Sequence, residues 1–282
     1  MSNLIETIYT PNNSLKNPIL LFKQMWSDLI ASFEPAYRLL VRDIKTEYRQ
    51  SLLGIFWAVI APVFASASFI LANSAKIINV GNVDLPYPAY VMFSMTLWQL
   101  FLGAFQAPIS ALASAGGLMT HIKFRYETSI LKQIWHLFYN LFFKMLLIIA
   151  LFIFFKLPLN WTILLVPFAL VIMIMFGALI GLLLAPIHML YKDIGRIIEL
   201  AMPFLMFITP VIYAVPETGG LATLMKLNPV TFLLVTVREL ATMGTVSFPF
   251  QFLLISLITL IIFPFAWLFV RLSVPFLVER FI

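Results

Sequence analysis

Six long apolar stretches constrain the fold of this chain more than any other feature. A helix of about 20 mostly apolar residues crosses the roughly 30 Å hydrocarbon core of a membrane. Only 11% of the 282 residues are charged, and short polar segments separate the stretches. We therefore expect an all-helical integral membrane protein with six transmembrane helices. The predicted spans are about 51–74, 90–111, 134–155, 161–188, 197–215 and 248–270.

A seventh apolar segment, residues 231–237, is too short to cross a membrane. It follows Asn228 and Pro229, which is typical of an N-cap residue with proline at the first helical position. We expect a short re-entrant or interfacial helix here, before the last span and on the periplasmic side.

Residues 35–50 have the pattern of an amphipathic helix. One face carries apolar and aromatic residues at helical spacing: Tyr37, Leu40, Val41, Ile44 and Tyr48. The other face carries cations: Arg38, Arg42, Lys45 and Arg49. Such a helix is suited to lie on a membrane surface, with its cations among anionic headgroups.

The basic residues predict the orientation, because cytoplasmic loops are enriched in Lys and Arg. With six spans both ends of the chain lie on the same side, and that side holds most of the cations. We expect a cytoplasmic tail over 1–34, the amphipathic helix over 35–50, a six-span permease domain over 51–270 and a cytoplasmic tail over 271–282. We see no cleaved signal peptide in the polar first 30 residues.

Few ionisable residues lie inside the predicted spans, and they include His136, Lys144 and His188. An intramembrane enzyme or proton-coupled carrier should place several there, so this pattern argues against both classes. Lys144 is explained by snorkelling or by facing the bundle interior. The chain has no cysteine, and we predict no catalytic residue and no metal site.

The sequence contains no Gly-Lys dipeptide and hence no phosphate-binding loop of the G-x-x-x-x-G-K-[ST] type. If ATP drives this protein, a partner subunit must bind ATP and Mg, and this chain would hold no cofactor. The loop 116–133 begins with a Gly-Gly break and mixes apolar with charged residues, so a short helix there could dock on a partner; the alternative is a basic loop that only anchors topology. Its candidate docking residues are Leu118, His121, Lys123, Phe124, Arg125, Tyr126 and Glu127.

Residues 42–62 read RDIKTEYRQSLLGIFWAVIAP. This run resembles the N-terminal signature of type 2 ABC transporter permeases that export polysaccharides, a family that includes O-antigen, capsule and teichoic acid exporters. Three later features agree in order: Tyr191 to Ile194, Thr209 to Tyr213, and Asn228-Pro229 followed by Arg238. The chain departs from the family in having Lys192 where Arg is frequent and in lacking a Phe-Pro pair before the third span.

The resemblance implies a transmembrane permease subunit in the cell (inner) membrane. Two copies would pair with each other and with two ATPase subunits to export a lipid-linked polysaccharide. The substrate that we expect first is O-antigen. Six helices are also too few to enclose a pore for a glycan, which favours a homodimer. The alternatives are a capsule or teichoic acid exporter, a drug, haem or antibiotic exporter, and an intramembrane glycosyl-lipid enzyme.

In the family the first, second and fifth spans line the channel, where aromatic faces can stack on sugar rings. The candidates here are Phe56, Trp57, Phe64, Phe69, Phe93, Trp98, Phe101, Phe105, Phe204, Phe207 and Tyr213. The alternative for each is packing between helices or facing lipid. Because the family's substrates carry phosphate, Arg42, Lys45 and Arg49 are candidates to attract the headgroup to a lateral gate, or merely to anchor on anionic lipid.

Overall fold

The computed structural model describes residues 18–49, 56–78, 80–81, 83–119, 126–191, 193–216 and 218–281. Within these residues the chain is helical, without strands. The elements are α2 (Pro18–Ala31), α3 (Phe33–Arg49), α4 (Trp57–Ser74), α5 (Tyr87–Met119), α6 (Tyr126–Phe154), the 3-10 helix η2 (Trp161–Leu165), α7 (Val166–Leu190), α8 (Asp193–Phe207), α9 (Gly220–Leu227), α10 (Pro229–Thr242) and α11 (Pro249–Phe281).

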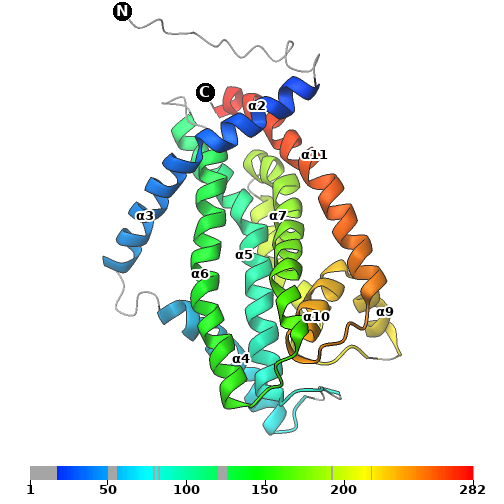
Figure 1. Ribbon diagram of the computed structural model, residues 1–282. Coiled ribbons are helices and arrows are strands. Elements are labelled where there is room, and N and C mark those ends of the chain that lie inside the picture. The colour runs from blue at the N-terminus through cyan, green and yellow to red at the C-terminus, as the bar shows by residue number, and fades with distance from the viewer. Residues whose placement is uncertain are drawn as a thin grey trace, which may run out of the picture.

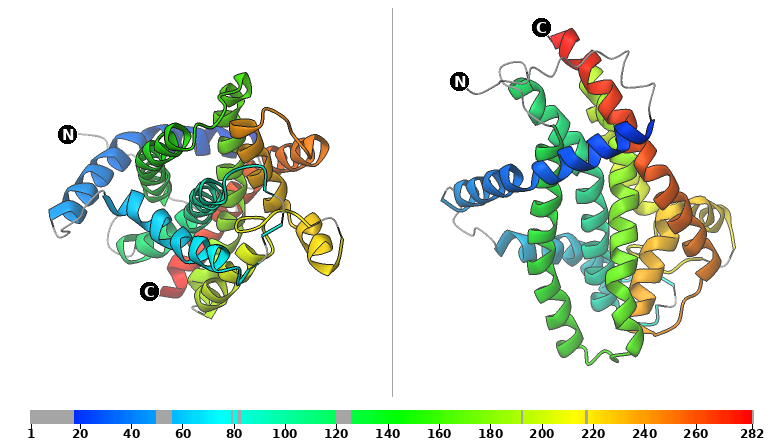
Figure 2. Two further views of the ribbon diagram at one scale, coloured as in Figure 1. Left: turned by 90° about the horizontal axis from the view of Figure 1, so that it is seen from below. Right: turned by 45° about the horizontal axis from the view of Figure 1, so that its top comes forward.

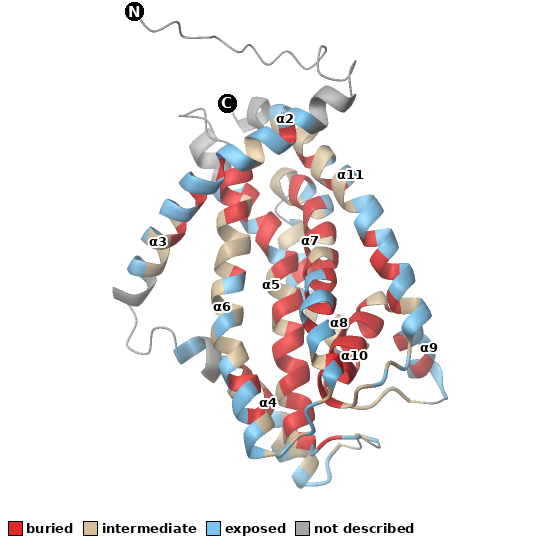
Figure 3. Cartoon of the chain, in the orientation of Figure 1, coloured by how far each residue is buried: buried red, intermediate tan, exposed pale blue. Residues whose placement is uncertain are grey.

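Helices α5 and α7 form the centre of the bundle, as Figure 1 shows, and most of α5 is buried (Figure 3). Their close approach depends on Gly177 and Gly181, one turn apart on α7. A methyl group on Gly177 would lie 3.0 Å from the carbonyl oxygen of Phe101, and one on Gly181 would collide with the carbonyl oxygen of Phe105. Small residues at this spacing let membrane helices pack backbone to backbone.

Four helical segments are long and apolar enough to cross a membrane, so the chain is a multi-pass membrane protein. They correspond to the second, third, fourth and sixth predicted spans, and each is longer than the span predicted for it. The bent pair of α9 and α10 could supply a fifth. The expectation of six spans is not confirmed, because the first and fifth predicted spans form shorter helices.

Of these two shorter helices, only α8 has a local structural reason for its length. Of the predicted span 51–74, residues 51–55 lie outside the described residues, and the helix α4 begins at Trp57. Helix α8 ends at Phe207, two residues before Thr209 and Pro210, and the chain turns from Ile208 to Tyr213. Proline removes a backbone donor and restricts the residue before it, which favours a helix end at this point.

Helix α10 follows α9 after a bend of 84°. Asn228 caps its start, where the side chain accepts a hydrogen bond from the Val230 N–H at 3.0 Å, and Pro229 is the first helical residue, as predicted. The helix is twice as long as the predicted segment, and every residue from Val230 to Thr242 is buried. It is therefore an internal element and not a helix on the surface.

Helices α2 and α3 lie at one end of the bundle, which we call the α2 end. There α2 crosses near the ends of α6 and α11, and α3 slopes away along α6 (Figures 1 and 2). Helix α3 is the predicted amphipathic helix, with Ala36 and Leu40 buried and Arg38 and Arg42 exposed. The opposite end of the bundle holds the loop between α6 and η2.

Candidate functional site

Arg238 of α10 is the centre of a buried polar cluster. One nitrogen of its guanidinium donates to Ser94 Oγ and to the carbonyl oxygen of Pro210, both at 2.9 Å. The guanidinium carbon lies 4.1 Å from the centre of the Tyr90 ring, a cation–π contact. Tyr90 in turn donates its hydroxyl hydrogen toward the carbonyl oxygens of Pro210 (3.1 Å) and Tyr213 (2.8 Å). These contacts join α5, α10 and the turn after α8.

Asn228 fixes the same turn from the other side of the cluster. Its side-chain amide donates to Thr209 Oγ1 at 2.8 Å and to the carbonyl oxygen of Ile208 at 3.2 Å. The Tyr213 hydroxyl donates to the carbonyl oxygen of Phe207. The motifs 209–213 and Asn228-Pro229, far apart in the sequence, therefore form one structural unit with Arg238.

The far end of α10 is held by hydrogen bonds to the loops around it. Glu239 accepts from the backbone N–H of Ser247 at 2.7 Å and from its hydroxyl at 2.6 Å. Asn160 and Thr162 donate to the carbonyl oxygens of Thr242 (3.2 Å) and Leu240 (2.8 Å). Buried polar groups need hydrogen-bond partners, and the partners found here anchor α10 at both ends.

Sequence reasoning named Arg238 but missed its partners on α5. Tyr90 and Ser94 stand four residues apart in a span that has no charge, so they lie on one helix face. Two polar residues at this spacing in an apolar span indicate a polar contact with another element. That signal was available, but it does not identify Arg238 as the partner.

Two of the three predicted headgroup cations, Arg42 and Lys45, lie on the exposed side of α3. Arg42 is 68% exposed and contacts Asp43 at 2.8 Å, and Lys45 is exposed. The side chain of Arg49 lies outside the described residues. These positions leave Arg42 and Lys45 accessible from solution or from a membrane surface, and their substrate role stays a prediction.

Asp43 ties α3 to α6 through Lys132, whose ammonium lies 2.8 Å from the carboxylate. Burial alone raises the pKa of Asp43, but hydrogen bonds from Lys132 and Arg42 outweigh it and hold the pKa below its ordinary value. Asp43 therefore stays ionised at neutral pH. Trp135, one turn further along α6, packs edge-on against Phe33 (5.5 Å) and Tyr37 (6.0 Å).

The predicted channel aromatics fall into two groups. The exposed ones are Phe56, Trp57, Phe64, Phe204 and Phe207, while Phe69 and Tyr213 are partly buried against the core. The other group is enclosed within this chain and consists of Phe93, Trp98, Phe101 and Phe105. These four fill the space that α5 shares with its neighbours, because the helix presents its aromatic face inward. In this arrangement they pack the core and do not face outward.

The predicted docking loop is shorter than expected. Helix α5 continues through Gly116 and Gly117 to Met119, so the expected break is not there, and α6 already begins at Tyr126. Two glycines cost a helix only about 1 kcal/mol each, which the rest of a long helix can offset. The residues His121, Lys123, Phe124 and Arg125 and the side chain of Leu118 lie outside the described residues.

Tyr126 and Glu127 are buried in the chain and are not on a docking surface. Glu127 lies 3.5 Å from Arg271 of α11, and Arg271 donates to Asp28 of α2 at 2.7 Å. One buried arginine thus joins α2, α6 and α11 at the α2 end. The start of α6, which follows the predicted docking loop directly, is held in place by this contact.

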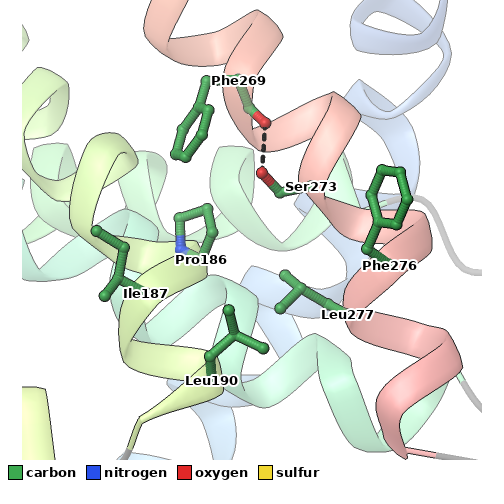
Figure 4. Close-up of a pocket in the computed structure, with 7 residues that line it drawn as sticks. All are labelled: Pro186, Ile187, Leu190, Phe269, Ser273, Phe276 and Leu277. Atoms are coloured by element: carbon green, nitrogen blue, oxygen red, sulfur yellow. Dashed lines mark hydrogen bonds between the residues drawn. The ribbon is translucent and has the colours of Figure 1, made fainter.

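A cavity of about 330 Å³ opens between the ends of α7 and α11 near the α2 end (Figure 4). Its lining is almost wholly apolar, and the Ser273 hydroxyl donates to the carbonyl oxygen of Phe269 of its own helix. The lining residues are Pro186, Ile187, Leu190, Phe269, Ser273, Phe276 and Leu277. The cavity offers space for an apolar group but no polar contacts that would select one.

Two permease proteins are similar to this chain over most of its length. The O-antigen export system permease protein RfbA of Myxococcus xanthus is 21% identical over 206 residues, which cover 72% of this chain and 78% of that protein. The RfbA protein of Klebsiella pneumoniae is 20% identical over 215 residues, which cover 74% of this chain and 80% of that protein.

The family model described as ABC-2 type transporter matches residues 36–242, from the start of α3 to the end of α10. The matched region contains the complete Arg238 cluster. With most of its length matched, this chain belongs to the ABC-2 type transporter family, as a membrane permease subunit.

Proposed function

We propose that this chain is the permease subunit of an ATP-driven exporter that moves a lipid-linked polysaccharide of the O-antigen type out of the cytoplasm. The observation that carries the proposal is the likeness, over about three quarters of the chain, to two proteins named O-antigen export system permeases. The basic amphipathic helix α3, beside the apolar bundle, supports a substrate with an anionic headgroup in the membrane.

The proposal includes six crossings with both termini in the cytoplasm, in the cell (inner) membrane. Helix α4 together with residues 51–55 would make the first crossing. Helix α8, about 22 Å long at 1.5 Å per residue, would make the fifth together with the turn 208–213. In support, α8 begins beside the end of α7, while its turn contacts Tyr90 near the start of α5, at the opposite end of the bundle.

Two copies of the chain and two ATPase subunits would form the complete exporter. ATP and Mg would bind only to the ATPase subunits, which would contact this chain through the predicted docking residues His121, Lys123, Phe124 and Arg125. The exposed aromatics Phe56, Trp57, Phe64, Phe204 and Phe207 would contribute to the glycan path between the copies. The Arg238 cluster would keep α10 in a fixed position beside that path.

The experiment is export from proteoliposomes that contain the purified chain and its ATPase partner. We expect ATP-dependent transfer of a lipid-linked O-antigen across the membrane, no ATP hydrolysis by the chain alone, and no transfer with an ATPase partner that cannot hydrolyse ATP. Transfer of capsular polysaccharide or teichoic acid, but not of O-antigen, would overturn the assignment of O-antigen as the substrate. Transfer of a small drug, with no glycan transfer, would refute the proposal.

A further inference from the structure

Four polar residues form a ladder along α6. Lys132, His136, Asn140 and Lys144 follow one another every four residues, and from Lys132 to the end of α6 the other residues are apolar except Gln133 and Tyr139. Residues at this spacing lie on neighbouring turns, and the ladder covers about 18 Å of the helix at 1.5 Å per residue. Asn140 lies within hydrogen-bond distance, 3.4 Å, of His136 Nδ1. The ladder starts where α3 docks and ends near the middle of the apolar segment.

The two lysines of the ladder differ in their surroundings. Lys132 is paired with Asp43 at 2.8 Å. Lys144 is half-buried and takes part in no hydrogen bond or ion pair with any side chain that the structure describes. The carboxylates that the structure describes nearest the α3 and α6 contact are already engaged, Asp43 by Lys132 and Glu127 by Arg271. An ammonium inside a membrane span is costly unless an anion or water reaches it.

We propose that the ladder is a binding site for the phosphate group of a membrane lipid, with Lys144 as its cation and Asn140 and His136 as hydrogen-bonding groups. Ammonium, amide and imidazole groups all donate to phosphate oxygens, and a charge-assisted hydrogen bond is the stronger kind. All three side chains are half-buried and therefore neither enclosed nor fully open. The ligand class is a phosphate monoester or diphosphate on a long apolar chain, whose tail would lie along the apolar face of α6.

The site has an access route from the membrane surface. Arg42 and Lys45 are exposed on α3, next to the contact between Asp43 and Lys132, where the ladder begins. A phosphate group drawn to these cations would next meet His136 and then Asn140 and Lys144. Because Lys132 is paired with Asp43, the first ammonium along α6 that is available to a ligand is that of Lys144, deeper in the span. This inference rests on the proposed function for the identity of the lipid, but not for the existence of the site.

The experiment measures lipid binding to the full chain, purified in a maltoside detergent that contains no phosphate, by native mass spectrometry. The probes are a polyprenyl phosphate, the polyprenol of the same length and inorganic phosphate. We expect the polyprenyl phosphate to bind more tightly than the polyprenol. The Lys144→Met variant should lose about tenfold in affinity, as expected for one charge-assisted contact, and Lys144→Arg should keep most of it.

The matched control is Lys156→Met, which removes the same charge from an exposed residue just past the end of α6 and should bind as the natural chain does. A Lys144→Met variant with unchanged affinity would overturn the inference, as would equal binding of polyprenol and polyprenyl phosphate. Displacement of the lipid by an equal concentration of inorganic phosphate would make the free anion the ligand and overturn the lipid assignment. Because methionine suits an apolar span, we expect Lys144→Met to fold.

Failure of this inference and failure of the proposed function give different results. If the natural chain exports glycan but Lys144→Met does not change lipid binding, the lipid site is refuted and the proposed function stands. If polyprenyl phosphate binds in a way that depends on Lys144 but no glycan is exported, the lipid site stands and the proposed function is refuted.

Discussion

At the scale of single residues, Arg238 shows how a charge is held inside an apolar protein without a countercharge. Among the described residues its guanidinium contacts a hydroxyl, a carbonyl oxygen and an aromatic ring, from Ser94, Pro210 and Tyr90. Hydrogen bonds to a charged group contribute about 1.5–3 kcal/mol each. The arginine therefore fixes the turn after α8 against α5 more strongly than a neutral side chain would.

Replacing Arg238 with methionine should destabilise the protein by about 2–4 kcal/mol, because Pro210 and Ser94 lose a buried partner. Tyr90→Phe, which removes only the hydroxyl, should cost about 1–2 kcal/mol. The measurement is the thermal unfolding temperature in detergent. The matched control is Arg196→Met, since that side chain is 84% exposed and its contact with Asp193 is 3.8 Å long. Equal unfolding temperatures for the Arg238→Met and Arg196→Met variants would contradict this role.

The residue types of the site could be read from the sequence, but the directions in which they point could not. Arg238, the turn 209–213 and Asn228 were recognisable as motifs, and Asn228 caps α10 as predicted. The aromatics of α5 are candidates both for a channel and for packing between helices, because apolar packing and sugar stacking demand the same side chains. In the structure Phe101 and Phe105 are 1% exposed within this chain. Only the position of α7 distinguishes the two.

At the scale of helices, the pairing of α5 with α7 is set by the two glycines of α7. Gly177 and Gly181 lie against the backbone of α5 from Phe101 to Phe105. Hydrophobicity predicted that both helices cross the membrane, because that property depends on composition alone. It did not predict their contact, which depends on where side chains are missing. The end of α8 at Phe207 was also unpredictable from hydropathy, which does not register where a helix is broken.

Gly181→Val should weaken the pairing of α5 with α7, because the added side chain would collide with the Phe105 carbonyl group and the helices must separate. We expect a loss of about 1–3 kcal/mol, the range for overpacking a tight contact, seen as a lower unfolding temperature and a broader peak in size-exclusion chromatography. The control is Gly220→Ala at the start of α9, where an added methyl group meets no atom within 4 Å. A Gly181→Val variant as stable as Gly220→Ala would refute the role of this contact.

At the scale of the whole molecule, helices α5, α7 and α11 run toward the α2 end and α6 runs away from it, so the bundle has two distinct ends (Figure 1). The α2 end holds α2, the start of α6, the end of α7 and the end of α11, joined in part by Arg271 (Figure 1). The opposite end holds the loop before η2. The basic residues near the α2 end favour a cytoplasmic location for it.

Single cysteines test this orientation cleanly, because the chain contains none. A membrane-impermeant maleimide added outside cells should label Leu159→Cys, in the loop before η2, and Gly220→Cys in α9. It should label Asp193→Cys only after the membrane is permeabilised. Labelling of Asp193→Cys from outside would reverse the orientation. Labelling of Gly220→Cys only from inside would mean that α8 and its turn do not complete a crossing.

The contact between Asp28 and Arg271 has a consequence for the order in which the protein is made. The two residues are 243 positions apart in the chain, and the arginine lies close to the C-terminal end. Helix α2 leaves the ribosome long before Arg271 is made, so this contact can form only after α11 has emerged. Until then the position of α2 depends on its contacts with α3 and α6.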